Sequence, residues 1–100
     1  MIDHVVLFAL KADPPRGDLP MLIARLRAVA ARIDGLEEYR LGTDLQLRPG
    51  NDDLAIVARF VDRASLESYL TDSEHRAVLA EYGPRLVAEK RSVQFEDDGA

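Results

Sequence analysis

Cysteine and tryptophan are absent from this sequence of 100 residues, and no apolar run approaches the length of a membrane span. Without cysteine the chain can form no disulfide, hold no metal through thiolates and use no cysteine nucleophile. A membrane-spanning helix needs about 20 consecutive, mostly apolar residues. The first residues also lack the basic segment, apolar core and cleavage site of a secretory signal. From the missing span and signal we expect a cytoplasmic protein.

Basic residues are fewer than acidic ones, 13 against 18, which gives a formal net charge of -5. This balance argues against nucleic acid and anionic membranes as partners. No phosphate-cradling glycine loop, nucleophile elbow or dinucleotide fingerprint occurs, so we expect no cofactor. The length suits a single domain, expected over residues 1–96 with an acidic tail at 97–100. The core of so short a chain is thin, which makes a partner subunit plausible.

The first ten residues are apolar on both alternating faces except at Asp3 and His4, which predicts a buried central strand. Apolar residues at three- and four-residue spacing then predict a helix with Asp18 as its N-cap. This helix is expected to end at Gly35, the residue best able to adopt a left-handed conformation. Alternation of apolar and polar residues predicts strands over residues 38–45 and 54–61, joined by a turn.

The second half of the chain predicts two short helices and a strand. Asp62 is expected to open the first helix, and Asp72 or Ser73 the second. Pro84 is expected to interrupt the second helix, because proline removes a helical donor and disfavours helix at the residue before it. One further helical turn is predicted at 86–87, and the last strand at 92–96.

With the two short helices counted as one helical segment, the order of elements is strand, helix, strand, strand, helix, strand. This is the split βαβ pattern of an α+β, ferredoxin-like fold, with an antiparallel sheet and its helices on one face. The other face of the sheet, lined by Val5, Leu7 and Ala9 or by their alternates, has no cover from this chain. An exposed apolar face of this kind marks an interface, so we predict a homodimer packed sheet to sheet.

The chain also resembles a known family, the stress-responsive dimeric α/β-barrel (Dabb) domain. The similarity covers roughly residues 2–96, and no single motif carries it. The order and spacing of several segments do so together. These segments are Ile2–Phe8, Ile33–Leu36 with Leu41–Leu45, Asp53–Phe60 and Tyr69–His75.

The resemblance implies a homodimer whose two sheets form a barrel, with a pocket between sheet and helices in each protomer. It implies no single activity: most members are uncharacterised, and some are associated with stress in plants. One branch contains a plant polyketide cyclase whose two catalytic histidines and tyrosine match His4, His75 and Tyr69 by position. The family often has His-Pro-x-His where this chain has Asp72-Ser73-Glu74-His75. The chain therefore keeps only the second histidine of that motif.

His4, His75 and Tyr69 are the candidate site residues. Histidine can take and return a proton near neutral pH, so His75 could act as base with His4 as its partner. Tyr69 could donate a hydrogen bond to a developing enolate. The alternatives are a core histidine at His4, a capping or surface histidine at His75, and tyrosines that only fill the core or an interface.

Other candidate sites are weaker. The two histidines with Asp72 or Glu74 could hold a metal, but they lack the spacing of a metal motif, and no metal site is expected. The acidic turn at 51–53 is more simply a solvated turn than a cation site. Two functions remain open. One is a homodimer that could bind a small apolar or phenolic ligand without turnover; the other is a cofactor-independent, cyclase-like aldol or lyase enzyme using His4 and His75.

Overall fold

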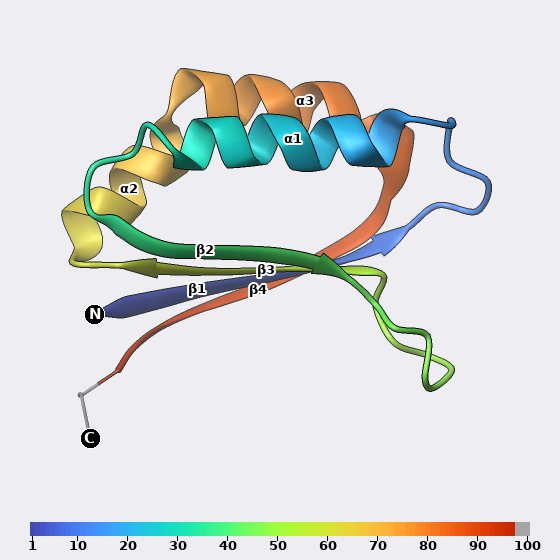
Figure 1. Ribbon diagram of the computed structural model, residues 1–100, viewed down its shortest axis with the longest axis horizontal. Coiled ribbons are helices and arrows are strands. Elements are labelled where there is room, and N and C mark those ends of the chain that lie inside the picture. Colours follow the sequence, from blue (N-terminus) through green and yellow to red (C-terminus); the bar gives the residue numbers. More distant parts are fainter. Residues whose placement is uncertain (98–100) are drawn as a thin grey trace.

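The structure is a computed structural model and describes residues 1–97. The seven elements follow the order β1 (Ile2–Leu10), α1 (Asp18–Ala30), β2 (Leu36–Thr43), β3 (Leu54–Phe60), α2 (Arg63–Thr71), α3 (Ser73–Leu86) and β4 (Val87–Glu96). The strands form one antiparallel sheet in the order β2-β3-β1-β4. All three helices lie on one face of this sheet (Figure 1). The predicted ferredoxin-like fold is confirmed.

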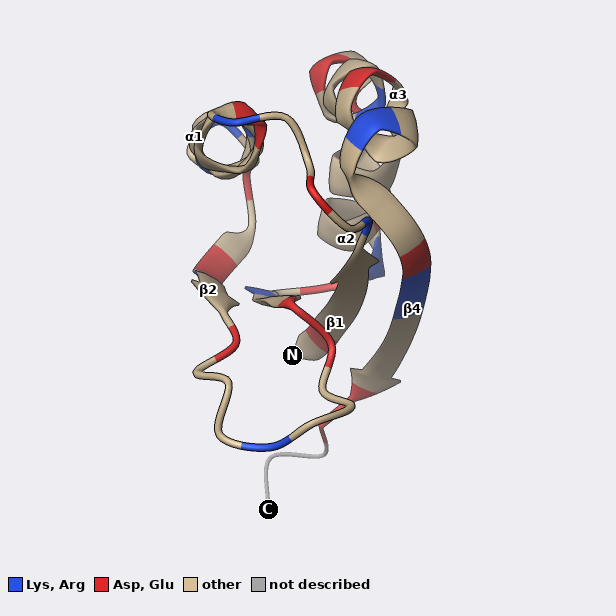
Figure 2. Cartoon of the chain, turned by 90° about the vertical axis from the view of Figure 1, so that its right-hand side faces the viewer, with Lys and Arg blue, Asp and Glu red and all other residues tan. Residues whose placement is uncertain are grey.

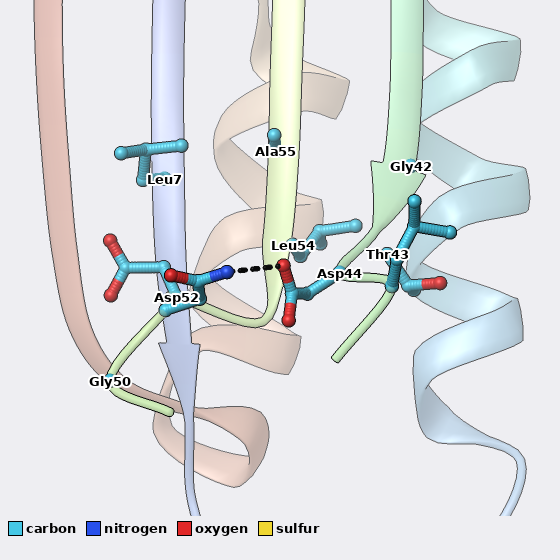
Figure 3. A pocket seen from close by; sticks show the side chains of 10 residues that line it. Leu7, Gly42, Thr43, Asp44, Gly50, Asp52, Leu54 and Ala55 are labelled. Atoms are coloured by element: carbon cyan, nitrogen blue, oxygen red, sulfur yellow. Dashed lines mark hydrogen bonds between the residues drawn. The ribbon is translucent and has the colours of Figure 1, made fainter. Parts of the chain in front are cut away.

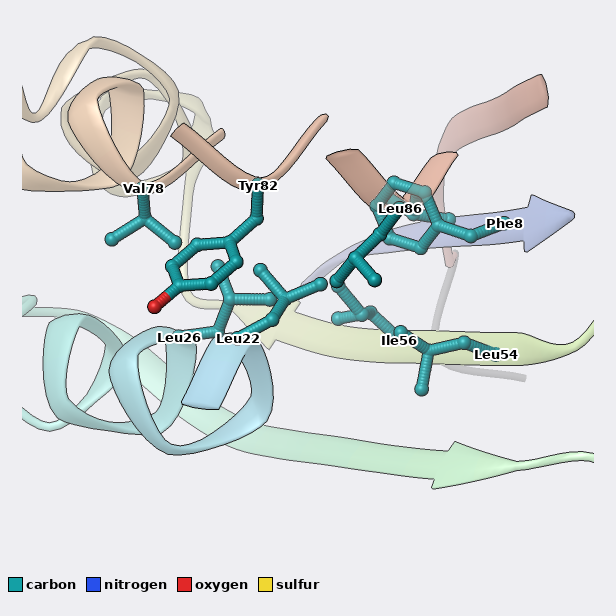
Figure 4. Packing of buried hydrophobic residues seen from close by; sticks show 9 residues of the cluster. Phe8, Leu22, Leu26, Leu54, Ile56, Val78, Tyr82 and Leu86 are labelled. Atoms are coloured by element: carbon teal, nitrogen blue, oxygen red, sulfur yellow. The ribbon is translucent and has the colours of Figure 1, made fainter. Parts of the chain in front are cut away.

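The covered face of the sheet holds the core, because alternate residues of the two central strands point at the helices. In β1 these are Ile2, His4, Val6 and Phe8, all buried. α1 lies over the β2 side of the sheet and α3 over the β4 side (Figure 2). Their apolar stripes meet the strands in the main cluster (Figure 4), which contains Val6, Phe8, Leu22, Leu26, Leu54, Ile56, Val78, Tyr82 and Leu86.

The opposite face of the sheet has no cover within the described chain. Leu7, Val93 and Phe95 lie on this face with 37%, 54% and 49% of their surface exposed. Near the start of β1, the guanidinium of Arg59 pairs with the carboxylates of Asp3 and Asp97. We call this side of the sheet the open face.

α1 differs from the prediction at both ends. Gly17, with φ 89°, is its N-cap, so the prediction of Asp18 as the cap was wrong. The Asp18 carboxylate instead pairs with Arg85 of α3, 3.0 Å from its Nε. The helix ends at Ala30, a turn earlier than predicted, and residues 31–32 and 34–35 form turns instead. Gly35 does adopt the expected left-handed conformation, with φ 84°.

The prediction that Pro84 interrupts the second helix was also wrong, because α3 runs through Pro84 to Leu86. Proline lies so close to the end that it removes only one of the last helical hydrogen bonds. The loop after β1 satisfies the terminal carbonyls instead: the backbone N–H of Lys11 donates to Leu86 and its ammonium to Pro84. The helical turn predicted at 86–87 gives way to β4, which begins at Val87 and pairs with β1 along its whole length.

The caps of the two later helices follow the prediction. The carboxylates of Asp62 and Asp72 accept the backbone N–H of Ser65 and His75, each at 2.9 Å. At the other end of the chain, the N–H of Asp97 donates to the carbonyl of Met1. The rest of the predicted acidic tail, residues 98–100, lies outside the described residues. None of the helices in the described chain is long and apolar enough to cross a membrane.

Candidate functional site

The three candidate residues converge under the helices although they come from different elements. His4 lies on β1, Tyr69 on α2 and His75 in the first turn of α3. The ring of Tyr69 packs against both imidazoles, with its centroid 6.0 Å from that of His4 and 4.2 Å from that of His75. All three side chains are buried, with at most 6% of their surface exposed. We call this group the His-Tyr-His cluster.

Local sequence explains each position. Alternation along β1 places His4 on the covered face, in line with Val6. Tyr69 lies on the buried side of α2, one turn from Leu66. Asp72 ends α2 and caps α3, which fixes His75 in the first turn of the new helix and directs it at the sheet.

Two further polar groups complete the cluster. Gln94 on β4 lies opposite His4 in the sheet, and its Nε2 donates to His4 Nδ1 at 2.8 Å. Neutral His4 therefore carries its proton on Nε2. The hydroxyls of Tyr39 and Tyr69 are hydrogen-bonded at 2.9 Å. No sequence pattern selects Gln94, because its role depends on the β1–β4 register. Tyr39 is not among the candidate residues of the sequence analysis.

His75 differs from His4 in its hydrogen bonding. Its Nδ1 is buried and has no hydrogen-bond partner within the described chain. A buried polar atom without a partner costs about 1 to 3 kcal/mol relative to a hydrogen-bonded one. A hydroxyl or N–H group brought to this nitrogen would recover part of that free energy.

The surroundings hold both imidazoles neutral. Burial lowers the pKa of His4 to about 4, with smaller contributions from the positive charge of Lys90 and from that of His75 when it is protonated. The pKa of His75 is also lowered by burial and by Lys90, while the carboxylate of Asp72 and the carbonyl of Leu70 oppose this shift. At neutral pH both rings can therefore donate and accept hydrogen bonds.

The tyrosines are likewise held in their neutral forms. Burial raises the pKa of Tyr69, and the neighbouring Tyr39 raises it further. Burial also raises the pKa of Tyr39, partly offset by its hydrogen bond to Tyr69. The cluster therefore holds several neutral hydrogen-bonding groups and no charged side chain at its centre.

The His-Tyr-His cluster lines none of the four main cavities of the described chain. A cavity of about 230 Å3 lies next to it, between α2 and β4, and is walled by Ile2, Leu66 and Gln94 among others. Gln94 thus borders this cavity and also bonds His4. In this conformation the side chains of the cluster pack against one another and line none of these cavities.

The largest of these four cavities, about 660 Å3, lies away from the histidines, where the open face meets the loop between β2 and β3 (Figure 3). Three carboxylates of this loop are already engaged. Asp44 accepts from Asn51 Nδ2 at 3.1 Å, Asp52 pairs with Arg91, and Asp53 accepts the N–H of Leu10. The acidic turn at 51–53 therefore serves to hold the loop. Within residues 1–97 no three potential metal ligands of the His, Cys, Asp or Glu type come together.

A four-stranded antiparallel sheet with helices on one face, an apolar open face and a covered polar cluster defines a ferredoxin-like α+β domain. The family description "Stress responsive A/B Barrel Domain" (Dabb) matches residues 2–97. The chain therefore belongs to the Dabb family. No protein of curated function matches it.

Several solved structures are similar over almost the whole chain. A dimeric ferredoxin-like protein of unknown function from Thermobifida fusca is 32% identical, with a TM-score of 0.85 over 96% of this chain and 90% of that one. A Dabb family protein from Mesorhizobium loti is 16% identical, with a TM-score of 0.78 over 98% and 97%. A hydroxynitrile lyase from Passiflora edulis is 16% identical, with a TM-score of 0.83 over 99% and 94%. At 16% identity, the similarity to the last two structures shows a shared fold alone.

Proposed function

We propose that this chain forms a homodimer through the open face of its sheet. The exposed Leu7, Val93 and Phe95 support this interface, because contiguous apolar surface of this kind marks association sites. The similar Thermobifida fusca protein is described as dimeric, which supports the same assembly. The large cavity beside Leu7 would then face the partner subunit.

Each protomer would bind a small apolar or phenolic molecule at the His-Tyr-His cluster. The observation that carries this proposal is the buried Nδ1 of His75, which has no hydrogen-bond partner in the described chain. A ligand hydroxyl could supply that partner. The neighbouring cavity of about 230 Å3 is large enough for one aromatic ring, since apolar cavities of roughly 150 Å3 hold benzene. Entry requires α2 and α3 to move slightly from β4.

Binding without turnover fits the cluster better than catalysis. An acid-base mechanism needs both imidazoles to reach a substrate, whereas Nδ1 of His4 is already bonded to Gln94 and, of the two Nδ1 atoms, that of His75 alone is without a partner in the described chain. The Passiflora edulis lyase gives a precedent for catalysis on this fold, but at 16% identity it supports the fold only. The aldol or lyase reaction through His4 and His75, and a cytoplasmic location, stay predictions.

The test uses NMR of the imidazoles during titration with phenol, and with benzene as the probe without a hydroxyl. We expect phenol to shift the His4 and His75 signals saturably, with a Kd on the order of millimolar for so small a ligand. His75→Leu should weaken phenol binding, while benzene should bind the variant as well as it binds the wild type. The proposed site would be contradicted if wild type and variant bound phenol with equal affinity, or if phenol caused no saturable shift of the His4 and His75 signals.

A further inference from the structure

The loop between β2 and β3, residues 44–53, carries two leucines that lie in solvent. Leu45 and Leu47 have 80% and 78% of their surface exposed, whereas the other exposed large apolar residues of the described chain lie between 37% and 54%. Figure 1 and Figure 2 show that this loop extends away from the helices, below the sheet. The loop therefore projects from the same side of the molecule as the open face. We call residues 44–53 the β2–β3 arm.

Hydrogen bonds at both ends of the β2–β3 arm fix its shape. The N–H of Asp44 donates to the carbonyl of Asp53 at 2.9 Å, and the N–H of Asp53 donates to the carbonyl of Phe8 at 2.8 Å. Between the two leucines, Gln46 has a left-handed backbone with φ 60°, and its N–H donates to the Asp44 carboxylate at 2.9 Å. Residues with a side chain disfavour this conformation, so the local contacts hold it. An arm that is already ordered loses little conformational entropy when it binds a partner.

The β2–β3 arm and the open face border the same cavity, the one of about 660 Å3. Leu45 lines it from the arm, and Leu7 and Ala55 line it from the open face. Figure 3 shows Leu7 and Ala55 on adjacent strands at this cavity. The apolar side chains of the arm therefore continue the apolar surface of the open face.

We propose that the β2–β3 arm packs against the partner subunit of the homodimer, with Leu45 and Leu47 covering part of the partner's open face. This inference rests on the proposed homodimer and adds a contact that the sheet alone does not provide. Continuity of the arm with the open face favours a second copy of this chain as the occupant, and the similar Thermobifida fusca protein is described as dimeric. Twofold symmetry makes the contact twice in each dimer, so four leucines leave solvent together.

A membrane surface is the other occupant that exposed leucines beside a cation suit, and Arg48 follows Leu47 directly. The formal net charge of -5 works against binding to anionic lipid. The position of the arm beside the open face favours the partner subunit instead.

The test compares the dimer Kd of wild type with that of the double variant Leu45→Ser/Leu47→Ser, by sedimentation velocity over a range of concentrations. The Kd should rise about 100-fold, because four leucines of each dimer would lose their apolar contacts. Both positions are exposed in the protomer, so the variant should fold, which circular dichroism checks. Met21→Ser is the matched control, since Met21 is 51% exposed on the outer side of α1, and it should leave the Kd unchanged.

A second readout locates the arm directly. The chain has no cysteine, so Arg48→Cys supplies a single thiol for a spin label on the arm and keeps both leucines. Spin-labelled protomers are mixed with isotope-labelled wild type, and NMR observes the isotope-labelled subunit alone. The label should broaden the signals of the open-face valines, Val5, Val57 and Val93. The same label on Met21→Cys should leave these signals sharp.

The arm contact is overturned if the double variant dimerises as tightly as wild type, or if the label at residue 48 broadens no open-face signal. The homodimer through the open face then stands, provided that Leu7→Asp weakens it. The arm contact is also overturned if wild type binds vesicles of phosphatidylcholine and phosphatidylglycerol and the double variant loses only this binding. A monomeric wild type would overturn the homodimer and the arm contact together.

Discussion

His4 is a histidine whose surroundings favour its neutral form, and this ties the stability of the domain to pH. Burial lowers its folded pKa to about 4, against an ordinary value of 6.5. Between these values the unfolded chain binds a proton that the folded chain does not. The contribution of neutral His4 to the free energy of unfolding is therefore fully present above pH 6.5 and is lost as pH falls toward 4.

We predict that His4→Gln reduces this acid destabilisation. The shift in the pKa of His4 corresponds to a loss of about 3 kcal/mol in the free energy of unfolding between pH 6.5 and 4. Urea unfolding at several pH values would measure it, with the difference between wild type and variant at each pH as the readout. If the two proteins lose stability in parallel as pH falls, His4 is not the buried neutral group described here.

Gly35 is the residue at which a side chain is least tolerable. Its φ is 84°, and a Cβ there would overlap Ser65 Oγ and approach Val61 to 2.9 Å. We predict that Gly35→Ala lowers the free energy of unfolding by about 2 to 4 kcal/mol, from the left-handed conformation and the overlap together. Gly50→Ala is the control, since φ there is 86° but no atom lies within 4 Å of the added Cβ. Equal losses in the two variants would contradict the close packing at Gly35.

The polar contacts of the site show what sequence can predict at this scale. His4, Tyr69 and His75 could be chosen from their residue types and the family resemblance, and the structure brings them together. Gln94 could not be chosen, because its bond to His4 depends on a strand pairing between residues 90 positions apart. The roles of these residues stay predictions.

At the scale of elements, the junction between α2 and α3 positions His75. The carboxylate of Asp72 accepts the N–H of His75 and pairs with Arg32 of α1 at 3.0 Å. Both interactions hold the carboxylate ionised and lower its pKa. This single side chain thus caps one helix and connects it to another.

We predict that Asp72→Ala costs about 1 to 2 kcal/mol of stability, because it removes a helix cap and a partly exposed ion pair. It should also lower the pKa of His75 further, since Asp72 raises that pKa in the native protein. Denaturant unfolding and NMR titration measure the two effects. Asp62→Ala removes only the cap of α2 and should leave the pKa of His75 unchanged; a similar pKa change in both variants would contradict this role.

Sequence patterns predict the ends of the elements less accurately than the elements themselves. The alternation in residues 1–10 and 54–61 identified β1 and β3 because a helix-covered central strand imposes a period of two. The start of β4 was not predicted, because residues 88–91 are exposed and carry little pattern. The end of α3 was not predicted, because Lys11, which is distant in the sequence, donates to the last carbonyls of this helix.

At the scale of the whole molecule, the open face determines the predicted assembly. We predict that Leu7→Asp raises the Kd of the homodimer by about 100-fold, because an unpaired carboxylate would be buried between two sheets. Met21→Asp is the control, since Met21 is 51% exposed on the outer side of α1, away from the sheet. Sedimentation velocity over a range of concentrations measures both. A stable dimer of the Leu7 variant, or a monomeric wild type, would exclude this interface.

The proposed function depends most on whether His4 and His75 form one buried neutral site. NMR titration of both imidazoles in wild type, His4→Gln and His75→Gln tests this directly. Both wild-type pKa values should lie below 6.5, with His4 near 4. The pKa of His4 should rise in His75→Gln, because His75, once protonated, lowers the pKa of His4 in the native protein. Two titrations near 6.5, each indifferent to loss of the other ring, would show two separate exposed histidines and contradict the site.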